Sequence, residues 1–429
     1  MQPTDLDNPK TIRSWAFFDW ANSSYSLVIV VAIFPAYFLN ATDHDLTFLG
    51  FQTTNSALLA YSVSLAYAFV ALLMPALAGI ADYGGRKMFF MRMFTTIGSV
   101  ACAAMFFFTK GLVHIGFWAY VIATIGYAGG VVFNNAYLPK IASEKNLDAA
   151  SAKGYTFGYI GSIILLILNL LWITFWEPLG FPDKAVAIRL AFLSVGLWWF
   201  GFAQIPFRGL PADRPGEVPL LVLVKKGWAQ LLEVFGEMQH HAQVKKYLMS
   251  FFFYNAGVQT VLFLASAFAD NELHFDTTHL ILLILLLQFV AIGGAWVFSK
   301  VSDRKGNKAS IMAMLMVWTA ICFTAYLVQN GTQFYLLAIA VGLVMGGIQS
   351  LSRSTYAKLL PENTLNTASW FSFYDVVEKV SVIFGTLTFG ILDQVTGSMR
   401  NSVLALAVFF VIAMIVLTSV TIERAVKNA

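Results

Sequence analysis

A charged hairpin sequence occurs twice in this chain, each time in a short polar break between two long apolar stretches. Residues 78–87 read AGIADYGGRK and residues 299–308 read SKVSDRKGNK, so that Asp82 and Asp303 lie about half the chain length apart. A repeat at this distance divides the 429 residues into two halves that carry the same element in the same place. Such a duplication is typical of membrane proteins built from two helical bundles.

The composition supports a membrane protein. The chain is 58% hydrophobic and 12% charged, whereas soluble domains contain roughly a quarter charged residues. A soluble core of this length could not bury so much apolar surface, but a lipid bilayer can cover it. We therefore exclude a soluble globular fold.

Twelve apolar segments are each long enough to cross a bilayer, which takes about 20 residues. They span residues 14–39, 55–81, 88–109, 114–138, 154–176, 186–206, 247–269, 277–301, 309–329, 332–358, 367–392 and 400–422. We predict an all-α membrane protein with twelve transmembrane helices in two pseudo-symmetric six-helix bundles. The expected domains are residues 1–206, a cytoplasmic linker at 207–246, and residues 247–429. The first segment lacks a small-residue cleavage site, so we expect a retained helix.

Basic residues predict the orientation. If both ends of the chain lie inside, most of the 27 Lys and Arg residues fall in inside loops and tails. The outside loops then hold only Lys110, Lys184, Arg189 and Arg400. This asymmetry predicts a multi-pass protein of the plasma membrane (the inner membrane in a bacterium) with both termini cytoplasmic. The net charge of +4 reflects this bias next to membrane lipid, and gives no reason to expect a nucleic-acid partner.

The linker contains an amphipathic segment. Trp228, Leu231, Leu232, Phe235 and Met238 share one face of a helix, and Lys226, Gln230, Glu233, Glu237 and His241 share the opposite face. We expect this helix to lie along the inner membrane surface and to tie the bundles together, with a regulatory docking site as the alternative.

The sequence contains no pattern for covalent chemistry. We find no metal-ligand spacing, phosphate-binding loop or nucleophile motif, and we expect neither a cofactor, a metal nor an enzyme activity. Cys102 and Cys322 occupy equivalent helices of the two halves, which favours packing over a disulfide.

The duplicated hairpin resembles the loop motif of the major facilitator superfamily, Gly-x-Leu-Ala-Asp-Arg-x-Gly-Arg-Lys. The first copy departs from it at Ala78 and Tyr83, and the second at Ser299 and Asn307. Within that superfamily, residues 18–25 (FDWANSSY) and 34–38 (FPAYF) resemble the vacuole-effluxer-like group, also called unknown major facilitators. Residues 346–354 (GGIQSLSRS) and 371–375 (FSFYD) resemble it as well. The resemblance runs nearly end to end, and it implies alternating access of two bundles.

We expect the hairpins to act in gating. Asp82 closes the second helix, where a carboxylate can lie against the amino end of a neighbouring helix. The superfamily resemblance places the start of the eleventh helix there. Gly84 and Gly85 supply the turn, and Arg86 can bind helix-end carbonyls or Asp82. Asp303, Arg304 and Gly306 are the second copy of this gate. A loop that serves only to set the topology is the alternative.

Ionisable residues within membrane spans are costly unless they are paired or hydrated, so each is a candidate for function. They are Asp19, Arg353, Asp375, Glu378 and Lys379. The resemblance places the first and tenth helices along the central cavity, so we expect an Asp19–Arg353 pair that binds solute. Asp375, Glu378 and Lys379 can neutralise one another on one helix. Together with Asp19 they are candidates for coupling to protons.

Uncharged polar side chains mark the helices that the resemblance places along the cavity. They are Asn22, Tyr25, Asn135, Tyr254, Asn255, Gln259 and Gln349. Amide groups both donate and accept hydrogen bonds, which suits a zwitterionic or polyhydroxy solute. Hydrogen bonding between helices is the alternative for each of them.

These observations predict a transporter that acts as a monomer and moves a small polar solute by alternating access. The resemblance implies export of amino acids or similar zwitterions. Uptake of sugar-like solutes or peptidoglycan fragments is the runner-up, and a non-transporting transceptor or scaffold is a different class of function. Proton coupling and simple facilitation both stay open.

Overall fold

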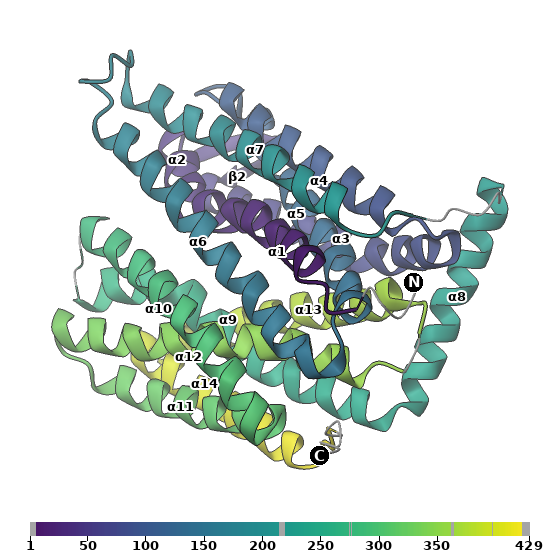
Figure 1. The fold of residues 1–429 in the computed structure, drawn as a ribbon. Coiled ribbons are helices and arrows are strands. Elements are labelled where there is room, and N and C mark those ends of the chain that lie inside the picture. Colours follow the sequence, from purple (N-terminus) through teal and green to yellow (C-terminus); the bar gives the residue numbers. More distant parts are fainter. Residues whose placement is uncertain are drawn as a thin grey trace. The chain divides into compact units, whose positions relative to one another are not determined.

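The computed structural model describes residues 6–213, 219–273, 275, 277–361, 364–396 and 398–422, and the protein is almost entirely helical (Figure 1). The first membrane helix has three parts: α1 (Pro9–Ser24), a π-helical segment η2 (Tyr25–Ile33) and α2 (Phe34–Ala41). The rest of the first half contains α3 (Asn55–Gly84), α4 (Lys87–Ala104), the short η3 (Met105–Phe107), α5 (Val113–Ile141), the short η4 (Glu144–Asn146), α6 (Leu147–Thr174) and α7 (Lys184–Gly209). The second half contains α8 (Leu220–His240), α9 (Ala242–Leu273), α10 (Thr277–Lys305), α11 (Asn307–Leu327), α12 (Gly331–Leu359), α13 (Thr367–Thr396) and α14 (Met399–Thr418).

The long helices match the twelve predicted spans one to one. Among the described residues, 10 helices are long and apolar enough to cross a membrane. Of the other two long helices, α13 contains Asp375, Glu378 and Lys379, and α9 begins with a polar turn that contains Lys245 and Lys246. Large apolar side chains such as Leu72 (77% exposed) and Ile415 (64% exposed) cover the outside of the bundles, as expected for contact with lipid.

Helix ends follow local signals. The side chains of Thr54, Asp183, Asn330 and Ser398 accept backbone N–H groups at the starts of α3, α7, α12 and α14. These four helices all begin on the predicted outer side. Because the first N–H groups of a helix have no partner within it, such caps define where each helix begins.

The chain forms two compact units, which we describe separately. The N unit comprises residues Pro9–Tyr137 and Phe157–Leu231, and the C unit comprises Met1–Asn8, Leu138–Thr156 and Leu232–Ala429. The C unit therefore includes the end of α5 and the start of α6, which precede the predicted linker by more than 50 residues. The domain limits at 206 and 247 stay a prediction.

Within the N unit, α1 and α4 each pack along α7. The helices α4 and α5 approach closely at Gly98 and Gly126, where a side chain on either glycine would collide with the other backbone. Small residues at such crossings let backbones touch, which is the usual way that membrane helices pack.

Within the C unit, α10 runs along α12, while α9 packs against α13 and α14. A side chain at Gly346 of α12 would collide with the carbonyl oxygen of Ala291 on α10. Gly294 meets the backbone of Leu343 in the same way. The glycines of the tenth span are therefore packing residues, as their position inside an apolar segment predicts.

A short β-hairpin, not predicted above, lies between the first two membrane helices. Strand β1 (Asp45–Phe48) pairs antiparallel with β2 (Phe51–Thr54), with Phe48 opposite Phe51. Leu49 and Gly50 form its turn, and both have positive φ. A two-residue turn with positive φ at both positions is the type that suits the twist of a hairpin.

The amphipathic helix predicted in the linker is present as α8. Leu231 and Met238 are buried, whereas Trp228, Leu232 and Phe235 of the same apolar face are about half exposed. The backbones of Gly227 and Gly79 touch where α8 crosses the carboxyl-terminal part of α3. Only part of the predicted apolar face is therefore left for lipid.

Candidate functional site

A buried carboxylate lies at the predicted cytoplasmic end of the C unit. Asp148, in the first turn of α6, is 2% exposed. Its Oδ2 receives bonds from Lys358 Nζ at 2.7 Å and Ser302 Oγ at 2.6 Å, and its Oδ1 receives one from Asn307 Nδ2 at 2.8 Å. We call Asp148, Ser302, Asn307 and Lys358 the Asp148 cluster. It joins α6 to α10, α11 and α12.

Charge placement favours the Asp148 cluster. Asp148 lies at the amino end of α6 and Lys358 in the last turn of α12, the ends at which helix dipoles favour an anion and a cation. Lys358 also donates to Asn307 Oδ1 at 2.8 Å, and Asn307 donates to Thr355 Oγ1 at 2.9 Å. Each charged group thus has several partners, which a buried ion pair needs in order to offset desolvation.

Asp7 holds the turn that leads into α6. Its carboxylate accepts the N–H of Ser143 at 2.8 Å, and its own N–H donates to the carbonyl of Ile141 at 2.9 Å. Burial raises the pKa of Asp7, but hydrogen bonds from Ser143 and Asn146 and the charge of Lys145 outweigh it, so the pKa is lowered overall.

Arg353 lies on α12 and contacts the same face of α6. Its Nε donates to Ser151 Oγ at 3.0 Å, its Nη2 donates to the carbonyl of Ser151 at 2.9 Å, and its Cζ lies 4.3 Å from the centre of the Tyr155 ring. Ser151 Oγ donates in turn to the carbonyl of Ser350 at 2.7 Å. Arg353 is 3% exposed, so its guanidinium is held in a fixed, largely desolvated orientation.

Two of the predicted polar residues of α9 bind neighbouring helices. The Tyr254 hydroxyl lies 2.7 Å from Ser352 Oγ on α12, and Asn255 Nδ2 donates to Ser381 Oγ on α13 at 2.7 Å. Gln259 Nε2 donates to Asn255 Oδ1 at 3.5 Å. These contacts fit the interhelical alternative for Tyr254 and Asn255; solute binding there stays a prediction, as it does for Gln349 on α12.

The three charged residues of α13 form a local cluster, as their spacing predicts. Lys379 Nζ lies 3.3 Å from Asp375 Oδ1 and 3.0 Å from Glu378 Oε1. Asp375 is 3% exposed and Lys379 is 7% exposed. Two carboxylates and one ammonium carry a formal charge of −1 when all three groups are ionised.

The first hairpin belongs to the N unit. Asp82 Oδ1 pairs with Lys87 Nζ at 2.6 Å, and both side chains are buried. Gly85 ends α3 in the left-handed conformation, with φ 61°, and the N–H of Arg86 donates to the carbonyl of Ala81 at 2.9 Å. Gly85 therefore supplies the predicted turn. Lys87 is a partner of Asp82 that the sequence analysis did not select.

The second hairpin belongs to the C unit. Gly306 takes φ 82° and starts α11, so the turn again requires glycine. Asp303 is partly exposed and lies 3.6 Å from Lys300. Its neighbour Arg304 is exposed at the end of α10. Ser302 and Asn307 of this hairpin bind the buried carboxylate of Asp148.

The predicted polar residues of the first helix are buried in the N unit. Asp19 is 8% exposed and Asn22 is 2% exposed. The Tyr25 hydroxyl donates to the carbonyl of Tyr120 at 3.3 Å and lies 2.8 Å from Thr124 Oγ1. Asn135 on α5 is 7% exposed. A solute role for these residues and the Asp19–Arg353 pair stay predictions.

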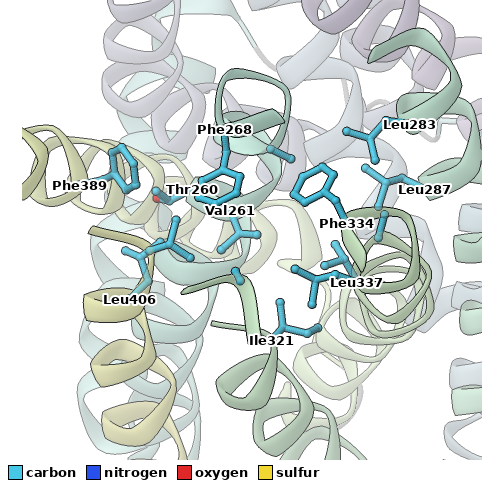
Figure 2. A pocket seen from close by; sticks show the side chains of 15 residues that line it. Thr260, Val261, Phe268, Leu283, Leu287, Ile321, Phe334, Leu337, Phe389 and Leu406 are labelled. Atoms are coloured by element: carbon cyan, nitrogen blue, oxygen red, sulfur yellow. The ribbon is translucent and has the colours of Figure 1, made fainter. Parts of the chain in front are cut away.

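The C unit also contains an apolar cavity between its helices (Figure 2). It encloses ≈ 560 Å³ of empty space, part of it open, and Phe268, Phe334 and Phe389 are among the residues that line it. Thr260 supplies a hydroxyl to the lining. Apart from Thr260, the lining residues that the structure describes are apolar, and the predicted solute residues are not among them.

The fold defines the class of protein. The structure matches a crystal structure of the major facilitator superfamily transporter FucP in the outward conformation with a TM-score of 0.71 and 12% sequence identity. The match covers 97% of this chain and 99% of that one. The protein therefore has the major facilitator fold, and its long apolar helices indicate an integral membrane protein.

Sequence comparison gives the family. The profile described as "Vacuole effluxer Atg22 like" matches residues 7–429, so the chain belongs to the vacuole effluxer Atg22-like family. A curated relative, the uncharacterized MFS-type transporter YxiO of Bacillus subtilis, is 29% identical over 96% of this chain and 95% of its own length. Autophagy-related protein 22 of Saccharomyces cerevisiae is 23% identical over 92% of this chain and 84% of its own length.

Proposed function

We propose that this transporter exports a small amino-acid-like solute across the plasma membrane, the inner membrane in a bacterium, by alternating access. The description of its family as effluxers supports the direction of transport. The amide and charged side chains on the first, seventh and tenth membrane helices support a zwitterionic solute, because they can bind both a carboxylate and an ammonium group.

The observation that carries alternating access is the Asp148 cluster. Asp148 comes from the first half of the sequence, and its partners Ser302, Asn307 and Lys358 come from the second half. We propose that this cluster closes the cytoplasmic side and opens when that side admits solute. Opening would separate Asp148 from Lys358 but would also return both charges to water. Because hydration offsets the lost attraction, the open and closed states can have similar free energies.

We place both termini in the cytoplasm, on the positive-inside rule. Reporter fusions after Ala41 and Asn330 should then be located outside, and a fusion after Ala149 should be located inside. The opposite result at Ala149 would exclude an inner gate at Asp148.

Within the transport path we propose Arg353 and Asp19 as a charge pair that contacts the solute. Removing one charge of such a pair leaves the other unpaired, which costs more than removing both. Asp19→Asn or Arg353→Gln alone should therefore reduce flux more than the double variant does. Losses that simply add would show that the two residues act independently, and would move the proposed solute contact to Asn22, Asn255 and Gln259.

Protons are the proposed coupling ion. The charge of −1 on Asp375, Glu378 and Lys379 is neutralised by one added proton, and a neutral cluster is cheaper to keep in the membrane. An imposed pH gradient should drive flux in wild-type vesicles but not in those with Asp375→Asn. Equal flux with and without the gradient would favour facilitation.

The test of the function is solute flux in proteoliposomes. We expect saturable counterflow of at least one radiolabelled amino acid, slowed by Asp148→Asn and by Lys358→Gln, with Asp303→Asn as the matched control of an exposed acid. If folded protein moves no amino acid, sugar or peptidoglycan fragment, the protein is a non-transporting scaffold.

A further inference from the structure

The first membrane helix contains an unusual stretch. Between α1 and α2, the nine residues Tyr25–Ile33 form a π-helix, and the N–H of Phe34 donates to the carbonyl of Ile29, five residues back. π-Helical turns are rare, are generally single, and often lie at functional sites. Each one holds one residue more than an α-helix would need over the same path.

The local sequence explains this stretch. Pro35 has no N–H, and in an α-helix its ring would collide with the carbonyl of Val31. A wider turn before Pro35 avoids the collision. Ile33 takes φ −112°, well away from the usual helical value near −63°, so the distortion is concentrated just before the proline.

Both ends of the π segment are fixed on a single residue of α5. The Tyr25 hydroxyl donates to the carbonyl of Tyr120 at 3.3 Å, and the Phe34 ring stacks on the Tyr120 ring at 4.5 Å. The seven residues 27–33 between these anchors are all apolar. Residues 27–33 have no polar side chain, so a change of helical register gives up only the contacts of Tyr25 with Tyr120 and Thr124 within this segment, while the Phe34–Tyr120 stack can hold α2 in place.

We propose that residues 25–33 form a register switch, in which a change from π-helix to α-helix rotates α1 while α2 stays fixed. The role of this switch in transport rests on the proposed function, whereas the change of register itself does not depend on it. Because the α form needs one residue fewer, each residue of α1 moves by one position. One position on a helix corresponds to about 100° of rotation and about 1.5 Å of rise.

The switch would change which side chains of α1 occupy a given position next to the neighbouring helices. Trp20 would replace Asp19, and Ser23 would replace Asn22. An indole in place of a carboxylate closes a polar path, and the reverse change opens it. The switch thus controls the two residues of the first helix that the sequence selects as solute ligands.

Two variants move the switch in opposite directions. Deletion of Val31, which is half exposed, combined with Pro35→Ala lets the segment become α-helical while α1 keeps its present position. Pro35→Ala restores the missing N–H and removes the ring, so it favours the α form with α1 shifted. The same deletion at the buried Ala16, in an α-helical part, should instead prevent folding.

The readout is the distance between spin labels at residues 13 and 208, both exposed in the N unit, in a Cys102→Ala, Cys322→Ala background. We expect the deletion variant to keep the main wild-type distance and Pro35→Ala to populate a second distance. A label pair at residues 89 and 208, outside α1, should show no change.

A single distance shared by wild type and Pro35→Ala would overturn the switch, even if the deletion variant fails to fold. A second distance in Pro35→Ala without any measurable solute flux would leave the switch intact and count against the proposed function instead.

Discussion

The two charged hairpins share a turn but differ in where their buried carboxylate comes from. In the first, the acid of the repeat is itself buried, since Asp82 pairs with Lys87 inside the N unit. In the second, Asp303 is partly exposed, and the buried acid is Asp148 from the start of α6. Gly85 and Gly306 take positive φ at matching places in both.

This difference shows that the local sequence sets the turn, whereas helix packing sets the position of the buried charge. The glycine depends on a few adjacent residues, so both copies place a positive-φ glycine three residues after the acid, with ψ 35° at Gly85 and ψ 158° at Gly306. The position of the buried charge depends on which helix packs against the hairpin, so it differs. The repeated motif therefore predicts the position of the turn glycine, but not the ion pair.

Loss of Asp148 should have the largest effect. Asp148→Ala leaves Lys358 buried without its carboxylate, and breaking such a pair costs about 3–5 kcal/mol in the free energy of unfolding. Thermal unfolding in detergent measures this loss. Asp148→Ala with Lys358→Met should recover part of it, because no unpaired charge remains. Wild-type stability of the single variant would show that the Asp148 cluster is not structural.

Asp82→Asn should have a smaller effect. Asparagine keeps an acceptor oxygen for Lys87 but loses the charge, which we expect to cost about 1–3 kcal/mol. We also expect a shift toward inward-open states and slower transport. Spin-label distances across the inner face measure the shift; unchanged distances together with wild-type flux would leave Asp82 with a topological role only.

The two turn glycines should differ from each other. Gly306 has φ 82° and ψ 158°, a region open almost only to glycine, so Gly306→Ala should cost about 1–3 kcal/mol. Gly85 has φ 61° and ψ 35°, which asparagine tolerates, so Gly85→Asn should cost less. Equal shifts in unfolding temperature for these two variants would contradict the difference in backbone conformation.

The turn before Asp148 should be sensitive to acid. The lowered pKa of Asp7 means that its contribution to stability is complete above its ordinary value of 3.8, and is lost as pH falls through the lower folded value. Wild type and Asp7→Asn should therefore differ in unfolding temperature at neutral pH and converge in strong acid. If the difference in unfolding temperature between wild type and Asp7→Asn does not change with pH, the stabilisation by Asp7 comes from its hydrogen bonds and not from its charge.

Asp303→Asn should have the smallest effect. Its pair with Lys300 is long and solvent-accessible, and such pairs contribute about 0–1 kcal/mol. Stability and flux should match wild type within error. A clear loss of stability or flux would mean that Asp303 and Asp82 have similar roles, which would contradict the difference between the two hairpins.

Much of the fold could be predicted from the sequence. The twelve spans, the glycine turns, the amphipathic linker helix and the cluster of Asp375, Glu378 and Lys379 all depend on residues close together in the chain. The π segment also has a local signal, Pro35 after a run of β-branched residues. The β-hairpin at 45–54 had a similar signal, a glycine between two short strand-like runs.

Asp148 could not have been found in this way. It lies in a polar loop between two spans, where an acid at the start of a helix is ordinary, and its partners Ser302, Asn307 and Lys358 are more than 150 residues away. The sequence by itself determined which segments enter the membrane and how each turn is made, because hydropathy and backbone preference are local. Only the tertiary structure decided which acid would be buried and which exposed, because that depends on packing between distant helices.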